Sequence, residues 1–305
     1  MLTVAVVMTV ASSVLLIALP GVAQSAVVSS LEFTVTRVIP SLFCFMVLSR
    51  FASTIDAARI LKPLLKPVTK LLHLSDDESG CFITGNLCGF PTGAALCSDL
   101  INKNGYSGNR AVTLVTASNN ISAGFMISFV GAGIFGSQRL GAILWACQFA
   151  ASICVCAFLR RKINPEDLEK KKYFSDVNVS SALVDAVKGG ASSSLYLTGF
   201  IVTFTVISAY AEHFMSVLGL PDAVSAAVTS FLEVTRGCSA ASVLGEPLSI
   251  ILVSFSAGFS GLCVIFQSAS FFVKSGVSIK NYISVKLAHG ILSALFALAC
   301  YYIFV

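Results

Sequence analysis

The chain has 305 residues, of which 56% are hydrophobic and only 11% are charged. Soluble domains carry about 25% charged residues, so this chain has too few charges to cover a compact surface in water. The composition excludes a disordered chain and a nucleic-acid-binding domain, and it predicts an all-α polytopic membrane protein. At about 20 residues for each span, the length accommodates roughly seven to ten membrane segments.

The first apolar run covers 2–19 and ends before Pro20. A secretory signal begins with a basic region, but no Lys or Arg precedes Arg37, and the run is longer than the usual ~7–15-residue core of such a signal. We therefore interpret 1–30 as a retained N-terminal transmembrane helix. A cleaved signal is the alternative.

Apolar runs of membrane-spanning length continue along the chain. The seven candidate spans are 2–19, 31–52, 111–135, 138–159, 192–215, 248–272 and 282–304. Two further apolar stretches, 79–101 and 223–243, are interrupted by Gly, Pro and polar residues. A broken backbone persists at membrane depth only where protein or a water-filled cavity satisfies its polar groups. We therefore predict about seven transmembrane helices plus two re-entrant or broken helices.

Charged residues orient these spans. The windows 50–78 and 160–188 hold nine and twelve of them, and the second window includes seven Lys or Arg residues. By the positive-inside rule, the linker 160–191 is cytoplasmic. The same orientation places the lysines that follow the sixth span in the cytoplasm, namely Lys274, Lys280 and Lys286.

Residues 59–73 form a distinct element. Lys62, Lys66 and Lys70 recur every four residues and so share one helical face, and leucines cover much of the rest. This pattern predicts a helix that lies at the cytoplasmic membrane interface.

The topology contains a repeat. Residues 31–159 and 192–305 each read as helix, broken segment, helix, helix, but they cross the membrane in opposite directions. Inverted repeats with paired broken helices are typical of secondary transporters, whose substrate lies between the breaks. This analogy concerns the fold and does not define a substrate.

The first candidate site is the break at 85–93. Three glycines and a proline within nine residues cannot continue a helix without interruption. A half-helix that begins near Pro91 would present free amides and partial positive charge, which favour an anion. We expect Asn86, Gly89 and Thr92 to belong to the same site. Close helix packing by small residues is the alternative.

The second candidate is Glu233-Val-Thr235-Arg236, in an apolar stretch with no other charge between 223 and 244. A charge at the bilayer centre costs about 2.5–3.5 kcal/mol, so such residues usually have a function. We predict that Arg236 binds a substrate anion, which a guanidinium can contact bidentately, while Glu233 orients it or accepts hydrogen bonds. A structural Glu–Arg pair, or a loop at the outer interface, is the alternative.

Two adjacent asparagines form the third candidate. The side chains of Asn119 and Asn120 point about 100° apart on a helix, so we expect only one to face the cavity. Interhelical hydrogen bonding is the alternative. Ser256 and Gln267 form a weaker polar counterpart in the second half of the chain.

No catalytic or metal-binding motif is present. The sequence contains no HExxH, no GxSxG and no CxxC, so we expect no enzymatic activity, no metal and no cofactor. The ten cysteines lie mostly in apolar runs, where they act as small apolar residues. Gln148, His213 and His289 are isolated, and we expect them to be packing residues.

Four motifs together resemble the YlbJ-type sporulation integral membrane proteins, of the nucleoside recognition (gate) domain family. The motifs are Asn86-Leu-Cys-Gly-Phe-Pro-Thr-Gly-Ala, Ser118-Asn-Asn, Glu233-Val-Thr-Arg-Gly and Phe259-Ser-Gly-Leu-Cys-Val-Ile-Phe-Gln. The resemblance covers about 30–300. It implies a spore-forming bacterium and transport of dipicolinic acid, a small planar dicarboxylate, across the outer forespore membrane.

We therefore predict an integral membrane protein of the bacterial cell membrane that transports a small organic anion. The anion would bind between the two broken helices, and the repeats, which we treat as gate-like, would rock to give alternating access. A nucleoside permease and a structural membrane protein of spore maturation are the alternatives. The expected partners are the anion, either dipicolinate or a nucleoside-like molecule, and the lipid bilayer. A homo-oligomer remains open.

Overall fold

The computed structural model describes residues 2–55, 62–160 and 179–304, and these ranges contain helices but no strand. The first part comprises α1 (Leu2–Ala18), α2 (Pro20–Phe33), the π-helical η1 (Thr34–Val38) and α3 (Ile39–Thr54). A bend of 97° separates Ser12–Ala18 from Pro20–Val38. The bend falls at Pro20, which begins α2 at a position where its missing N–H is tolerated.

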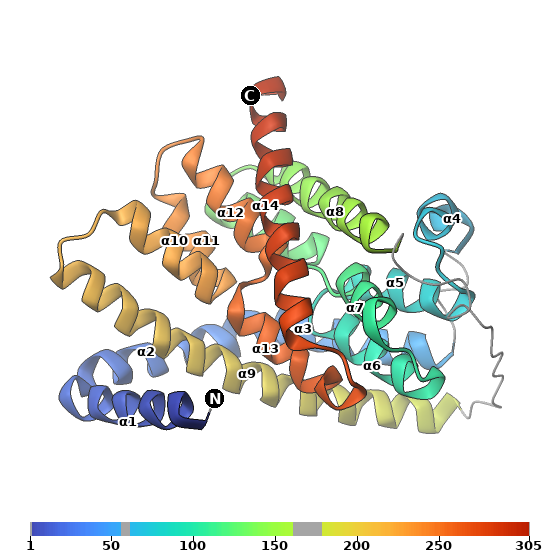
Figure 1. The fold of residues 1–305 in the computed structure, drawn as a ribbon, viewed down its shortest axis with the longest axis horizontal. Helices are drawn as coiled ribbons and strands as arrows, with labels where there is room; N and C mark the ends of the chain where they lie inside the picture. The colour runs from blue at the N-terminus through green and yellow to red at the C-terminus, as the bar shows by residue number, and fades with distance from the viewer. Residues whose placement is uncertain (1, 56–61, 161–178, 305) are drawn as a thin grey trace.

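Both halves of the chain then contain a hairpin, an interrupted helix and a long helix in the same order. The first half contains α4 (Lys62–Leu71), α5 (Asp76–Cys88), α6 (Thr92–Asn104), α7 (Gly108–Ser118), η3 (Phe125–Ile134) and α8 (Gln138–Arg160). The second half contains α9 (Val179–Val217), α10 (Asp222–Leu232), α11 (Val234–Ser242), α12 (Leu248–Phe259), α13 (Gly261–Phe272), η5 (Val273–Ser275) and α14 (Ile279–Phe304). A hairpin of two short helices, an interrupted helix and one long helix therefore occur twice (Figure 1).

Fewer helices have the length and hydropathy of a membrane span than the seven spans that the sequence predicts. Within the described ranges, four helices are long and apolar enough to cross a membrane, or five if the bent N-terminal pair is one span. The seven predicted spans are therefore not confirmed. One reason is that the predicted span 111–135 is divided into α7 and η3, and an 11-residue helix such as α7 rises only about 17 Å against an apolar core of about 30 Å.

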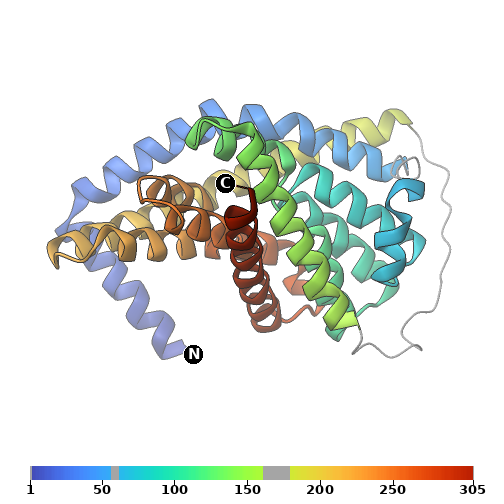
Figure 2. The ribbon, with the colours of Figure 1, turned by 90° about the horizontal axis from the view of Figure 1, so that it is seen from above.

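Helix α9 is longer than a single span requires. Its 39 residues rise about 58 Å, and it begins at Val179 rather than at 192. The charged linker expected at 160–191 therefore ends in a helix, while 161–178 lies outside the described residues. In Figures 1 and 2, α9 runs along the molecule beside α2 and α3, with which it packs.

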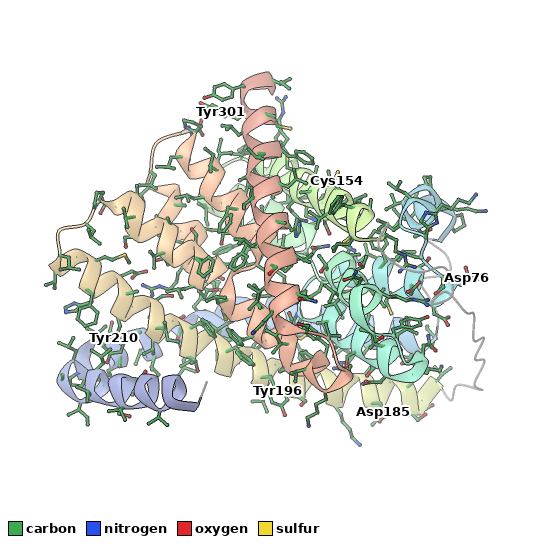
Figure 3. The ribbon with its side chains drawn as sticks, in the orientation of Figure 1. Asp76, Cys154, Asp185, Tyr196, Tyr210 and Tyr301 are labelled. Carbon is green, nitrogen blue, oxygen red and sulfur yellow. The ribbon has the colours of Figure 1, made fainter. Side chains whose placement is uncertain are left out.

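The two ends of α9 lie in different surroundings. Tyr210, near its C-terminal end, has its hydroxyl 3.1 Å from the Leu15 carbonyl oxygen and 3.2 Å from that of Leu19, at the bend after α1. Figure 3 shows Tyr210 at this end, whereas Asp185 lies at the far end and Tyr196 points outward between them. The contact of Tyr210 fixes the N-terminal bend against α9.

A buried ion cluster holds the first half together. The carboxylate of Glu78 is 2.9 Å from Arg110 Nε on α7 and 3.5 Å from Arg160 Nη2 at the end of α8. Ser75 and Glu78 also form a reciprocal capping box that begins α5. All three ionic side chains are buried, including that of Arg160, which the sequence assigns to the cytoplasmic linker.

The helix predicted over 59–73 is present over part of that range. Helix α4 covers Lys62–Leu71, whereas 59–61 lie outside the described residues. Lys66, Lys70 and Leu64 are exposed, and Leu72 is fully buried against the core. An exposed leucine beside exposed lysines fits a helix whose outer face meets the membrane interface.

Candidate functional site

The predicted break between 85 and 93 is present. Helix α5 ends at Cys88, Gly89 adopts a left-handed φ of 77°, and α6 begins at Thr92. A Cβ atom on Gly93 would lie 2.0 Å from the Ser118 carbonyl oxygen, and one on Gly85 would lie 2.2 Å from the same atom. The glycines therefore permit both the break and close packing of the hairpin against the end of α7.

Asn119 lies where α7 ends and joins the two halves of the chain. Its Nδ2 is 2.7 Å from Ser268 Oγ on α13 and 3.1 Å from the Tyr282 hydroxyl on α14. Its Oδ1 accepts a hydrogen bond from the Ala94 amide in the first turn of α6, at 3.2 Å. Asn119 therefore links the first hairpin to the helices of the second half.

The side chain of Asn120 points in a different direction from that of Asn119, as expected for adjacent residues. Its Nδ2 is 3.0 Å from Asn86 Oδ1 and 3.1 Å from Ser152 Oγ on α8. Asn86 in turn donates from Nδ2 to the carbonyl oxygens of Phe82 and Ala117, at 2.8 Å each. These contacts agree with the interhelical hydrogen bonding that was the alternative interpretation of both asparagines.

The second hairpin breaks at Glu233, between α10 and α11. Glu233 has an extended backbone, and its buried carboxylate accepts hydrogen bonds from the amides of Thr235, at 3.0 Å, and Arg236, at 2.7 Å. It thereby caps the N-terminus of α11, where a carboxylate is stabilised by the helix dipole. Glu233 does not pair with the guanidinium of Arg236 in the structure, so the alternative of a structural Glu233–Arg236 pair is wrong.

Arg236 pairs instead with Glu212 on α9. Two guanidinium nitrogens contact the two carboxylate oxygens, and the Nε contact to Oε1 measures 3.3 Å. The side chains of Arg236 and Glu212 are 33% and 30% exposed. The sequence predicts a charge at the bilayer centre, whereas the structure leaves about a third of the Arg236 side chain exposed. Glu212 was missed, although it is the only acidic residue in the predicted span 192–215.

A further break divides the predicted span 248–272. Ser260, between α12 and α13, adopts a left-handed φ of 75°, and Gly261 follows with a φ of 64°. A Cβ atom on Gly261 would lie 3.1 Å from the Val234 amide nitrogen, so the glycine lets this break approach the tip of the second hairpin. No local sequence pattern predicts a left-handed serine at this position.

The tips of both hairpins line one narrow cavity of about 40 Å³. Gly89 and Phe90 contribute from the first hairpin, and Glu233 and Thr235 from the second. Gln267 on α13 also lines it, and both polar atoms of its buried amide lack a hydrogen-bond partner among the described residues. This volume accommodates a few waters but no organic substrate.

A larger cavity of about 600 Å³ adjoins the narrow one. The residues that line both are Ile201, Glu233 and Thr235. Arg236 and Glu212 line the larger cavity, together with Phe33 and Phe129, whose ring centroids are 5.9 Å apart.

The structure therefore gathers some of the predicted site residues and not others. Those that line one or both cavities are Gly89, Glu233, Thr235, Arg236 and Gln267. Those that line neither are Asn86, Pro91, Thr92, Asn119, Asn120 and Ser256. Ser256 Oγ, for example, donates to the Ser230 carbonyl oxygen at 3.2 Å. The second group surrounds the breaks and supports their geometry.

These features define an all-helical integral membrane protein in which interrupted helices meet around two adjoining cavities. The chain is similar to the sporulation integral membrane protein YlbJ of Bacillus subtilis (strain 168), with 26% identity over 302 residues, covering 86% of this chain and 73% of that protein. The YlbJ-type resemblance predicted from the motifs is thereby confirmed. No family model matches the chain, and no solved structure matches it.

Proposed function

We propose that the protein is a membrane transporter of a small organic anion, with dipicolinate as the first candidate. The observation that carries this proposal is a guanidinium, that of Arg236, in a cavity of about 600 Å³ beside the hairpin tips. Cavities of about 300–1,000 Å³ are typical of small-molecule sites. Dipicolinate comes from the resemblance to a sporulation protein and not from the geometry of the cavity.

The chemistry of the larger cavity fits a planar carboxylate. A substrate carboxylate could take the place of the Glu212 carboxylate on Arg236, because both present two oxygens to the guanidinium. Phe33 and Phe129 offer aromatic faces and edges for a ring, and Thr235 offers a hydroxyl. Substrate binding would then leave Glu212 free of its partner.

The narrow cavity supplies a closed gate in this proposal. The larger cavity has room for a substrate, whereas the space between the hairpin tips holds only about 40 Å³. Movement of one repeat against the other would widen the space beside Gln267 and admit the substrate. The repeated order of hairpin, interrupted helix and long helix supports such a movement.

A nucleoside permease is the second candidate. The Glu212–Arg236 pair is neutral, and Glu233 adds a second carboxylate to the cavity wall, so a neutral solute with a ring and several hydroxyls also fits. The hydroxyls of Ser29, Ser30 and Ser239 line the same cavity and can form hydrogen bonds with such a solute.

Uptake into proteoliposomes tests the proposal. We expect radiolabelled dipicolinate to enter vesicles that contain the wild-type protein, and Arg236→Gln to reduce initial uptake by at least tenfold. Arg139→Gln is the matched control, because Arg139 is an exposed arginine at the start of α8 and lines neither cavity. Full uptake by Arg236→Gln, or no uptake by the wild type, would reject the anion assignment.

Two additions separate the alternatives. Excess unlabelled uridine competes with dipicolinate only if the site also accepts nucleosides. The double change Glu212→Arg with Arg236→Glu restores an ion pair but reverses its orientation. A structural membrane protein should keep its wild-type melting temperature and sporulation activity with this exchange, whereas an anion site should lose uptake.

A further inference from the structure

One face of α14 carries a buried polar stripe. Tyr282, Lys286, His289 and Ser293 recur at helical spacing, and each is fully buried. The sequence assigns Lys286 to the cytoplasm, whereas the structure buries it inside the protein. His289, which the sequence predicts to be a packing residue, is buried beside it. Lys286 lies seven residues into α14, which corresponds to about 10 Å along the helix axis. A fully buried lysine is rare unless its charge is paired.

Lys286 and His289 contact each other directly. Lys286 Nζ is 3.1 Å from His289 Nδ1, and His289 Nε2 is 2.7 Å from the Gln148 carbonyl oxygen on α8. A carbonyl oxygen only accepts hydrogen bonds, so Nε2 carries the proton and Nδ1 of the neutral ring accepts one from Lys286. Because a second proton on Nδ1 would face the lysine ammonium, the pair holds a single excess proton.

No carboxylate neutralises that proton among the described residues. The elements that pack against α14 include α7, α8 and α12. Helix α12 carries no ionisable side chain, and the only one on α7, that of Arg110, pairs with Glu78. Between its terminal arginines, helix α8 carries only the thiols of Cys147, Cys154 and Cys156 as ionisable groups, and none of them is a carboxylate. Its terminal arginines are Arg139, which is exposed, and Arg160, which contacts Glu78.

Polar side chains around the Lys286–His289 pair can rearrange when Lys286 gains or loses a proton. Gln148 is fully buried on α8, and both polar atoms of its side chain lack a partner among the described residues. Tyr282, one turn before Lys286 on α14, has its hydroxyl 3.1 Å from Asn119 Nδ2 at the break after α7. A change of charge on Lys286 is therefore one helical turn from the contact that joins α14 to the first hairpin.

We propose that Lys286 and His289 form a proton-binding site that couples substrate movement to the proton gradient across the membrane. The coupling, though not the proton site itself, rests on the proposed function. The pair takes a proton from water on one side, holds it as a lysine ammonium hydrogen-bonded to Nδ1, and returns it to water on the other side. No bond other than N–H is made or broken, and no other reactant is needed.

The first experiment needs no substrate. Detergent-purified protein is stepped from about pH 9 to about pH 5, and the protons taken up are measured with an indicator dye. We expect the wild type to take up one proton more than Lys286→Met. Lys280→Met is the matched control on the same helix, because Lys280 is exposed and an exposed lysine stays protonated throughout this range. Equal uptake by wild type and Lys286→Met would overturn the proton site.

The second experiment tests coupling in proteoliposomes. With an inward proton gradient, we expect wild-type vesicles to accumulate dipicolinate at least fivefold over vesicles without a gradient. Lys286→Met should lose this accumulation but retain exchange of labelled for unlabelled dipicolinate at equal pH. His289→Gln should show the same loss, and it provides a second variant should Lys286→Met not fold.

The outcomes separate the two proposals. Wild-type exchange of dipicolinate with no response to the gradient would overturn coupling and leave the transporter proposal intact. Accumulation by Lys286→Met equal to that of Lys280→Met would also overturn coupling. No dipicolinate movement by the wild type would reject the substrate and with it this coupling, while the proton count would still decide whether the pair binds a proton.

Discussion

Replacement of Gly93 by alanine tests whether the first hairpin packs against the end of α7 as the structure has it. The new Cβ atom would lie 2.0 Å from the Ser118 carbonyl oxygen and 2.6 Å from its carbonyl carbon. Ordinary contacts need about 3.5 Å, so the two backbones must separate by more than an ångström. Such overpacking costs about 1–3 kcal/mol.

Gly80→Ala is the matched control in the same hairpin. Gly80 lies within α5, and nothing lies within 4 Å of a Cβ atom placed there. Replacing a helical glycine by alanine in open space gains up to about 1 kcal/mol. The two variants should therefore differ by about 1–4 kcal/mol, which corresponds to roughly 2–15 °C in melting temperature.

The single tryptophan makes this difference measurable. Trp145 stacks on Phe149 of α8, with ring centroids 5.4 Å apart, and it lies outside the altered hairpin. Its fluorescence can follow thermal unfolding of the detergent-purified protein. If Gly93→Ala melts at the same temperature as Gly80→Ala, the close approach of the hairpin to Ser118 is refuted, and with it the placement of the Gly89 tip.

Two further predictions test the packing of α8. The sulfur atoms of Cys147 and Cys300 lie 3.5 Å apart, so copper–phenanthroline oxidation should join them in a disulfide. Mass spectrometry should find the cross-linked peptide in the wild type and not in Cys300→Ser. Absence of this peptide from the wild type would contradict the contact of α8 with α14. Glu78→Gln leaves two buried arginines without a counter-charge and should destabilise the protein by about 3–5 kcal/mol, whereas the exposed neighbour Asp77→Asn should change the melting temperature little.

Several parts of the fold followed from local sequence. The breaks at 89–91 and at Glu233 were predicted because Gly and Pro, or a charge in an apolar run, cannot continue a membrane helix without compensation. The helix at 62–71 followed from the spacing of its lysines. Such signals lie within one or two turns, so they need no knowledge of what packs against them.

The partners of the charged residues could not be predicted in this way. The guanidinium of Arg236 pairs with Glu212, 24 positions earlier, whereas Glu233, three positions away, binds only the backbone amide of Arg236. Lys286 lies near other lysines in the sequence and was therefore assigned to the cytoplasm, yet it is buried beside His289. Charge counts give the orientation of a loop but not whether one of its residues turns inward.

The sequence by itself determined that this protein is helical, membrane-embedded and interrupted at two hairpins, because hydropathy and chain-breaking residues act locally. Only the tertiary structure decided that further breaks occur at 119–122 and at Ser260, and that both hairpin tips line one cavity. Those breaks are stabilised by contacts between distant segments, such as Asn119 with Tyr282 and Gly261 with Val234. Hydrogen bonds and close approaches between segments depend on three-dimensional packing, which the order of residues along one helix does not display.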